Sequence, residues 1–424
     1  MCHLGSITAL ALLSGVLIAG ACSQPAPSSP VVAYKNGRWF MGAAFEARTM
    51  YVQGDRFIER PERIDSVVDL GGGYVVPPFG EGHNHNVDPT RVDALIRTYM
   101  QAGVFYVLNP NSLPQTRDDL AGWLNRPEAP DVIFANGGIT GPGGHPVGIV
   151  QRNVTRGVWT DAEGEGAFLF SVANATDLER AWPALLASSP DFVKVYLLYS
   201  EEYDARLADP ATIGWRGLDP DLIPDVVQRA REAGLRVVAH VETAADFRVA
   251  VVAGVDQVVH MPGFRGDENT TLSDPSRYQI SEADAQTAGH TGIVVVTTLA
   301  ALAEYATERR DTAFRATVDR LNRTNLAVLA EHGVAIAIGS DAYDDTSVRE
   351  ALYLATLGVL DHAALLRSWS ETTPRAIFPD RQIGRLAPGY EASFIVLDGD
   401  PLAHFTNVTR IRTAVKQGQP VTLH

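Results

Sequence analysis

Two histidines one residue apart end an apolar stretch near the start of the chain. Residues 75–82, Val-Val-Pro-Pro-Phe-Gly-Glu-Gly, lead directly into His83-Asn84-His85. Side chains alternate between the two faces of a strand, so we expect His83 and His85 to point to the same side. Neutral imidazole is a common ligand for zinc and related metals, and two on one face can share an ion. The pair therefore predicts a metal site, provided that further ligands lie at equivalent places in the fold.

Four more residues of this kind end or interrupt apolar runs that we interpret as buried strands. Taken singly, a histidine at a strand end is more often structural than a ligand. A lysine within an apolar strand is costly to bury without a partner, so it is the least expected of the four. Together with the histidine pair they make six potential ligands at successive strand ends, which predicts a metal centre. They are Lys194 in the run 192–197, His240 after 236–239, His260 after 256–259 and Asp341 after 336–340.

An alternation of buried strands and amphipathic helices has to position these residues. Counting residues 74–76 as the first strand gives eight strand–helix units over about 300 residues, the number and size of a closed (β/α)8 barrel. Active sites of such barrels lie at the carboxyl ends of the strands, where the six residues fall. A doubly wound open sheet is the alternative, but no glycine-rich phosphate loop follows the first strand. The other predicted strands are 105–108, 132–136, 192–197, 236–240, 257–260, 293–297 and 335–340.

Short β segments flank this region on both sides. Residues 31–76 contain several, and Asn36-Gly37 and Gly54-Asp55 between them are typical of hairpin turns. Similar segments occur in residues 383–424. We therefore expect an α/β protein in which residues 77–382 form a TIM barrel. Residues 31–76 and 383–424 would form one small β-sandwich built from both ends of the chain.

Composition limits the classes of partner. The chain has 424 residues, of which 46% are hydrophobic, enough for a large core. A net charge of −15 and the lack of lysine and arginine clusters argue against nucleic-acid binding and against electrostatic attachment to membranes. A small-molecule substrate is the expected partner, and the oligomeric state is left open.

The first 30 residues have the composition of an export signal. Residues 7–21 are apolar, too short to span a bilayer comfortably, and end in Ala-Gly-Ala before Cys22; residues 23–30 have a linker composition. Residues 1–22 resemble a bacterial lipoprotein signal, which implies lipidation of Cys22 as the only membrane attachment. A plain secretory signal is the alternative. Either interpretation predicts an exported, periplasmic or membrane-anchored protein. The only other cysteine is Cys2, so we expect no disulfide or thiolate site after the signal.

Nearly the whole chain after this signal resembles the amidohydrolase superfamily, in its two-metal branch with a bridging lysine. The resemblance rests on the six strand-end residues, on the loop 140–145 (Thr-Gly-Pro-Gly-Gly-His) and on the segments 371–376 and 383–393. The loop and the strand around Lys194 look closest to imidazolonepropionase-like enzymes and to metal-dependent Xaa-Pro or Arg/Lys-specific dipeptidases. The resemblance implies a TIM barrel with an added β-sandwich, and a hydrolase that depends on divalent metal ions.

The resemblance also implies roles for the ligands. His83, His85 and Asp341 would hold the more buried of two metal ions, with zinc the expected metal. His240 and His260 would hold the more exposed ion.

Three further residues receive supporting or bridging roles. Lys194, carboxylated by carbon dioxide, would bridge the two ions as a carbamate, whereas an unmodified Lys194 would fit a centre with one ion. Glu81 takes the place where the family usually has aspartate, two residues before the first histidine, and would support the ligands without binding metal. Glu242, two residues after His240, is expected to do the same.

Hydrolysis also follows from the chemistry of such a centre. Divalent ions lower the pKa of bound water towards ~7 and polarise a carbonyl oxygen. Asp341, bound to metal through one oxygen, is expected to take a proton from the water and deliver it to the leaving amine. A serine triad is disfavoured because the sequence contains no Gly-x-Ser-x-Gly motif.

Candidate substrate contacts lie in the loops that follow the strands. His145 could donate a hydrogen bond, Arg265 could pair with a carboxylate, and Tyr199 closely follows Lys194. We expect cleavage of an amide-type C–N bond in a dipeptide or a cyclic amide. Hydrolysis of an ester, lactone or organophosphate on the same metal pair is one alternative. A non-catalytic metal- or solute-binding lipoprotein is the other.

Overall fold

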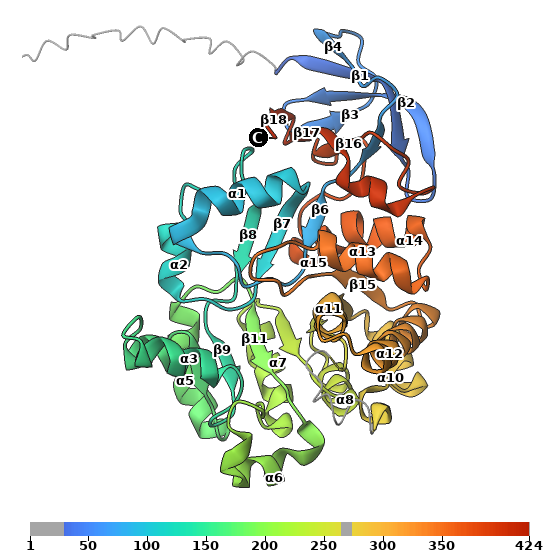
Figure 1. Cartoon of the computed structure of the whole chain (residues 1–424). Helices are drawn as coiled ribbons and strands as arrows, with labels where there is room; N and C mark the ends of the chain where they lie inside the picture. The colour runs from blue at the N-terminus through green and yellow to red at the C-terminus, as the bar shows by residue number, and fades with distance from the viewer. Residues whose placement is uncertain (1–28, 264–273, 424) are drawn as a thin grey trace, which may run out of the picture.

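A computed structural model of the chain describes residues 29–263 and 274–423 (Figure 1). The predicted signal with Cys22, and the candidate contact Arg265, lie outside the described residues. Figure 1 shows two regions: a β-rich region that contains both ends of the described chain, and a larger region of alternating strands and helices. Within the described ranges, no helix is both long and apolar enough to cross a membrane.

In the larger region, the described residues form ten short strands in two parallel sheets, in the orders β6-β7-β8 and β10-β9-β11-β12-β13-β14-β15. Almost all residues of these strands are buried, as expected when both faces of a parallel sheet are covered. The strands are β6 (Phe79–Glu81), β7 (Val104–Asn109), β8 (Asp131–Phe134), β9 (Gly138–Thr140), β10 (Leu169–Ser171), β11 (Val193–Tyr196), β12 (Val237–His240), β13 (Gln257–Val259), β14 (Val294–Thr297) and β15 (Ala335–Ile338).

At two places around the barrel, the strands at the edges of the two sheets are not paired with each other in a ladder. At the first, β8 pairs with β7 and β9 pairs with β11, and only residues 135–137 lie between β8 and β9. At the second, Gly82 N donates to Ile338 O at 2.8 Å, and Asp341 N donates to His83 O at 2.8 Å. The ladder is therefore not continuous around the barrel, but the strands follow one another in chain order except for β10, which pairs with β9 at the edge of the larger sheet. The predicted (β/α)8 architecture is confirmed.

Helices follow the strands and cover the outside of the barrel (Figure 1). Their buried residues join those of the strands in one large hydrophobic core. The α-helices are α1 (Val92–Gln101), α2 (Pro114–Asp119), α3 (Val147–Thr155), α4 (Asp161–Gly164), α5 (Ala175–Ala187), α6 (Tyr203–Ala208), α7 (Ile223–Glu232), α8 (Ala244–Ala253), α10 (Glu282–Thr291), α11 (Ala300–Glu308), α12 (Thr312–Glu331), α13 (Val348–Leu357), α14 (His362–Arg367) and α15 (Thr373–Ile377).

The β-rich region is one eight-stranded sheet built from both ends of the chain, as Figure 1 shows in blue and red. Its order is β18-β17-β16-β5-β1-β2-β3, with β4 paired to β1. The rings of Phe57 on β3 and Phe394 on β16 lie 6.0 Å apart although three strands separate them, so the sheet folds over its own core as a sandwich does. The strands are β1 (Val31–Phe40), β2 (Phe45–Gln53), β3 (Arg56–Ile58), β4 (Ser66–Asp69), β5 (Tyr74–Val76), β16 (Phe394–Leu397), β17 (Ile411–Lys416) and β18 (Gln419–Val421).

Two details of the prediction are wrong. The segment Tyr74–Val76 is not the first barrel strand, because it forms β5 between β1 and β16 of the sandwich. Pro77-Pro78 ends that pairing, since proline has no N–H to donate, and the barrel begins with β6. Asn36-Gly37 is not a hairpin turn but a bulge within β1, where Asn36 has a φ of +57°. The predicted hairpin at Gly54-Asp55 joins β2 to β3 as expected.

A buried ionic network fastens the sandwich to the amino-terminal end of the barrel. Lys416 of β17 donates through Nζ to Asp131 Oδ1 at 2.6 Å, and Arg381 donates to the other Asp131 oxygen at 2.7 Å. The same arginine donates to Glu391 at 2.6 Å, and Tyr106 OH donates to that carboxylate at 3.2 Å. Each of these buried charges therefore has an opposite charge or a hydrogen-bonding partner.

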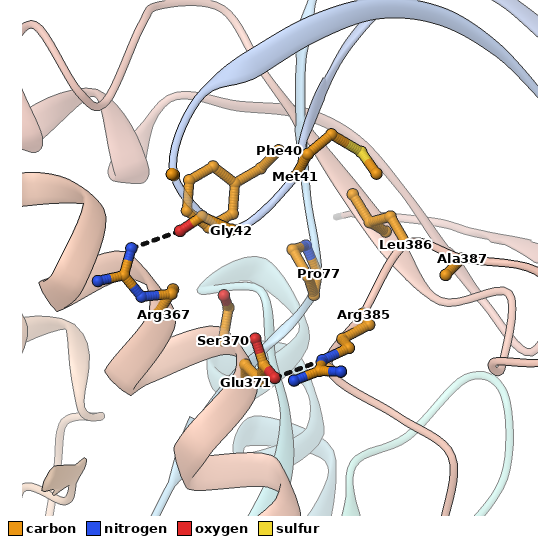
Figure 2. A pocket seen from close by; sticks show the side chains of 12 residues that line it. Phe40, Met41, Gly42, Pro77, Arg367, Ser370, Glu371, Arg385, Leu386 and Ala387 are labelled. Carbon is orange, nitrogen blue, oxygen red and sulfur yellow. Dashed lines mark hydrogen bonds and ion pairs between the residues drawn. The ribbon is translucent and has the colours of Figure 1, made fainter. Parts of the chain in front are cut away.

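A cavity of about 370 Å³ lies at the same junction, between the turn after β1 and the helices near residue 370 (Figure 2). Arg367 of α14 donates to Gly42 O across it, and Arg385 pairs with Glu371. Both contacts join the two regions. The residues that line this cavity include none of the six candidate metal ligands.

Candidate metal centre

The two ends of the barrel sequence bring the first three candidate ligands together. His83 and His85 follow β6, and Asp341 follows β15. Asp341 Oδ1 lies 3.7 Å from His83 Nε2 and 3.5 Å from His85 Nε2. The ligand atoms of the three residues all lie within 4.8 Å of one another, so one divalent ion fits among them. The pair follows the strand instead of lying within it, yet the rings converge with centroids 5.0 Å apart.

The remaining histidines lie beside this group. The rings of His240, which ends β12, and His260, which follows β13, are 4.4 Å apart, and His260 lies 4.6 Å from His83. All three side chains are at most 2% exposed. The second pair therefore adjoins the first. Within the described ranges, the His83–His85–Asp341 group is the only set of three His, Cys, Asp or Glu residues that meets the 4.8 Å criterion.

Glycines and uncommon backbone angles allow this close approach. A Cβ on Gly339 would lie 2.7 Å from His83 N, so β15 could not approach the histidine segment with a larger residue there. His260 and Asp341 have φ values of +71° and +49°, in the left-handed region that residues other than glycine seldom adopt. Such strain persists where the surroundings enforce it, and it is frequent at functional sites.

Lys194 lies inside β11, next to the strand that ends in His240. Its side chain is fully buried, and Nζ has no hydrogen-bond partner among the described residues. Burial lowers the pKa of Lys194 to about 7, although the charge of Asp341 acts in the opposite direction. The side chain is therefore largely an uncharged amine above neutral pH. Only an uncharged amine can react with carbon dioxide to form a carbamate.

Three polar residues hold the candidate ligands in place. Glu81 is fully buried and accepts hydrogen bonds from Ser340 N at 2.7 Å and Ser340 Oγ at 2.8 Å. Burial raises the pKa of Glu81 to about 8 despite these donors. Glu242, the other residue predicted to support the ligands, is fully buried, with Oε2 3.9 Å from His240 Nε2. Thr298, which the sequence did not single out, is hydrogen-bonded to His260 Nδ1 at 2.6 Å and so leaves Nε2 toward a metal.

These residues surround one cavity at the carboxyl ends of the strands. Five of the six candidate ligands line it, whereas Lys194 is fully buried and is not among the lining residues. His145 lines the cavity too, with its ring 5.1 Å from that of His240. The other lining residues are Asn111, Pro146, Ile149, Tyr196 and Tyr343.

Sequence reasoning missed most of that second set, although a signal was present for one of them. Tyr196 lies two residues after Lys194 in β11, so alternation along the strand points both side chains to the same side. Asn111 and Tyr343 lie in the loops after β7 and β15, and the left-handed backbone of Asp341 interrupts any alternation before Tyr343. Tyr343 is 54% exposed and its ring stacks at 6.1 Å on that of His85, at the mouth of the cavity.

Tyr199 is not among the residues that line the cavity. It is 3% exposed, and its ring lies 3.6 Å from the guanidinium carbon of Arg206 and 4.9 Å from that of Arg277. Its backbone N–H donates to Asp246, which also accepts from the N–H of Glu242. Tyr199 is thus part of the wall that joins the loops after β11 and β12.

Solved structures share this fold. A prolidase complexed with N-methylphosphonate-L-proline matches with a TM-score of 0.67 at 19% identity, covering 92% of this chain and 99% of its own. A Xaa-Pro dipeptidase with bound methionine matches with 0.69 at 16% identity, covering 92% and 99%. Ochratoxinase from A. niger matches with 0.71 at 14% identity, covering 92% and 95%.

A search of curated proteins found no match. The model of the amidohydrolase family matches residues 210–421, half of the chain, a stretch that contains His240, His260 and Asp341. The predicted hydrolase class, acting on C–N bonds, is thereby confirmed. With its barrel, its folded terminal sheet and its convergent histidines, the chain belongs to the amidohydrolase family.

Proposed function

We propose that the protein hydrolyses an amide-type C–N bond in a dipeptide or a cyclic amide. The observation that carries this proposal is the convergence of five ligand-type side chains on one cavity, together with the fully buried amine of Lys194. Two solved structures of the same fold are a prolidase and a Xaa-Pro dipeptidase, which favours a peptide-like substrate.

The donor set fits divalent metal. His83, His85 and Asp341 would hold one ion, and we propose zinc because two imidazoles and a carboxylate suit it. His240 and His260, with a carboxylated Lys194, would hold a second. Bound divalent metal supplies Lewis-acid activation of water and of a carbonyl oxygen.

The side chains would then handle protons and orientation. The Asp341 carboxylate takes a proton from the attacking water and returns it to the leaving nitrogen, since a neutral amine leaves more readily than an amide anion. His145, on the cavity wall, donates a hydrogen bond to the substrate. Glu81 and Thr298 keep the backbone of the histidine segment and the ring of His260 in place.

Metal content tests the proposal first. Protein purified without chelators should carry two equivalents of zinc or a similar metal by mass spectrometry, and Lys194→Ala should carry one or fewer. His332→Ala is a matched control, because it removes a histidine that pairs with Glu282 and does not line the cavity, and it should keep the wild-type content. One equivalent in both wild type and Lys194→Ala would make the lysine a non-ligand. No metal after reconstitution would contradict the proposal and favour a binding protein.

The leaving group separates amide hydrolysis from the ester, lactone or organophosphate alternative. Asp341→Asn should lower kcat/KM for a dipeptide by about 10²- to 10⁴-fold, the range for loss of a general acid–base. An aryl ester needs no proton on its leaving group and should lose less. Equal losses, or turnover of esters and lactones alone in the wild type, would favour the alternative.

We also propose export with lipidation at Cys22, on the composition of residues 1–22 alone. Incorporation of labelled palmitate by the wild type but not by Cys22→Ser would support it. A soluble periplasmic product without label would favour the plain secretory signal.

A further inference from the structure

Asn111 is held in one orientation by the backbone of two neighbouring loops. It lies two residues after β7, and its Nδ2 donates to Asn136 O at 3.0 Å and to Phe168 O at 2.9 Å. A carbonyl oxygen can only accept a hydrogen bond, so a flipped amide would place Oδ1 against two acceptors. The orientation of this side chain is therefore determined by its partners.

The other end of the amide is unsatisfied. Asn111 is 5% exposed, and its Oδ1 is buried and has no hydrogen-bond partner among the described residues. Leaving a buried acceptor without a donor costs about 1–3 kcal/mol, and native proteins contain few such atoms. Other nearby polar residues also have an unpartnered buried atom, but Asn109, Ser112 and Asn136 do not line the cavity. Asn111 does.

We propose that Asn111 Oδ1 accepts a hydrogen bond from an N–H group of the substrate and thereby selects substrates that carry one. This inference rests on the proposed function and names the chemistry of its substrate. Both Nδ2 hydrogens are engaged by the two backbone carbonyls, so Oδ1 is the atom left to meet a ligand in the cavity. In barrel order, the loop after β7 lies between the His83–His85 segment and the loop with His145. A rigid neutral acceptor there favours the α-ammonium group of a dipeptide over an analogue without it.

The test compares each dipeptide of a panel with its desamino analogue, in the metal-loaded wild type and two variants. Removing the amino group deletes the donor and also a charge, but the wild type and Asn111→Ala are both neutral at residue 111, so the loss of charge affects these two proteins alike. Only the part of the preference that depends on Asn111 is therefore diagnostic. In the wild type we expect kcat/KM to favour the dipeptide by about 10- to 100-fold, the size of one buried hydrogen bond lost.

The two variants separate a binding role from a merely structural one. Asn111→Ala removes both the loop contacts and the acceptor, and should reduce the preference to within twofold. Asn111→Asp keeps an oxygen towards the cavity, adds a negative charge that attracts the α-ammonium group, and turns its other oxygen against the two carbonyls. It should therefore lose stability and keep or increase the preference. Ser112→Ala, in the same loop, should behave as the wild type. If Asn111→Asp loses the preference as fully as Asn111→Ala, the residue only holds the loops and the inference is overturned.

Calorimetric binding of the uncleaved dipeptides and analogues distinguishes the inference from the proposed function. Hydrolysis of both members of each pair at equal rates would overturn the inference and leave the proposed function intact. Binding that depends on Asn111 and on the amino group, without any hydrolysis, would support the inference and contradict the proposed function. Neither hydrolysis nor such binding would overturn both.

Discussion

Two lysines in this protein are fully buried, and their surroundings are opposite. Lys416, where the sandwich meets the barrel, donates to Arg126 O at 2.8 Å, to Ala129 O and to Asp131 Oδ1 at 2.6 Å. All three hydrogens of its ammonium group are used. Lys194, inside β11, has no hydrogen-bond partner for Nζ among the described residues. The ammonium group of Lys416 thus has all its hydrogen-bond acceptors within the protein, whereas the amine of Lys194 has none among the described residues.

The difference separates two uses of a costly residue. Burial lowers the pKa of both lysines, but for Lys416 the neighbouring Asp131 opposes that shift directly through an ion pair. A buried charge with all its partners fixes the geometry of two packed regions. A buried amine without partners weakens the fold, and it persists where chemistry needs it. Lys416 therefore serves the structure, and we propose that Lys194 serves the site.

Activity gives the largest expected contrast. Lys194→Met should lower kcat for the best substrate by at least about 10³-fold, equivalent to about 4 kcal/mol, because the proposed bridging ligand would be lost. Lys416→Met should change kcat of the folded protein less than threefold. Steady-state kinetics at a temperature where both variants are folded would measure this, with folding checked by circular dichroism. Comparable losses of kcat in the two variants would contradict the assignment of a structural role to Lys416 and a site role to Lys194.

The free energy of unfolding should show the opposite order, with the larger loss when Lys416 is replaced. Lys416→Met leaves the Asp131 carboxylate with Arg381 alone and should lower the free energy of unfolding by about 3–5 kcal/mol, as when one partner of a buried pair is removed. Denaturant melts of metal-free protein would measure it. The double variant Asp131→Leu, Lys416→Met is the control and should recover part of the loss, because it removes both charges. If it recovers none, the lost packing of Lys416 matters more than the charge.

Metal-free protein should become more stable when Lys194 is replaced. Lys194→Met removes an unsatisfied buried amine and keeps the side chain's length, so unfolding at pH 8 should cost about 1–3 kcal/mol more. Buffers freed of carbon dioxide are needed, since a carbamate would change the reference state. A destabilised Lys194→Met would show that the amine has a partner in the metal-free protein.

The smallest expected effect is on how the free energy of unfolding changes with pH. The pKa of Lys194 is about 7 in the folded protein, against 10.5 ordinarily, so between these values the unfolded chain binds more protons. Stability of the metal-free wild type should therefore fall as pH decreases from 10 to 7, by at most about 1.4 kcal/mol per pH unit. Lys194→Met should lack this contribution. Parallel slopes in the two proteins would place the folded pKa near its ordinary value.

The positions of the candidate ligands could be predicted because they depend on local patterns. His240, His260 and Asp341 each end or follow an apolar run, and the topology of a parallel barrel brings all such ends to one side. The limits of the barrel were less certain, because Tyr74–Val76 and Phe79–Glu81 are both short apolar segments. Only pairing partners, which are distant in sequence, assign the first to the sandwich and the second to the barrel.

The substrate side of the cavity was harder to predict for a related reason. The side chain of Asn111 is oriented by hydrogen bonds to the carbonyls of Asn136 and Phe168, which lie on two other loops. Nothing in the neighbouring residues of Asn111 indicates such contacts. For Tyr199, closeness to Lys194 in the sequence suggested a substrate contact. In the fold its ring packs against the guanidinium groups of Arg206 and Arg277.

The folded terminal sheet also sets an order of assembly. Two residues separate β5 from β6, which leads into the histidine pair, and β5 is held between β1 and β16, with Val76 opposite Ile395. Strand β5, which precedes the strand that leads into the first two ligands, therefore lacks one of its two neighbours until β16 has been synthesised. A prematurely terminated chain would contain every candidate ligand up to Asp341 and still lack this support. The sheet thus makes the support of the first ligands depend on a strand that is synthesised after every candidate ligand.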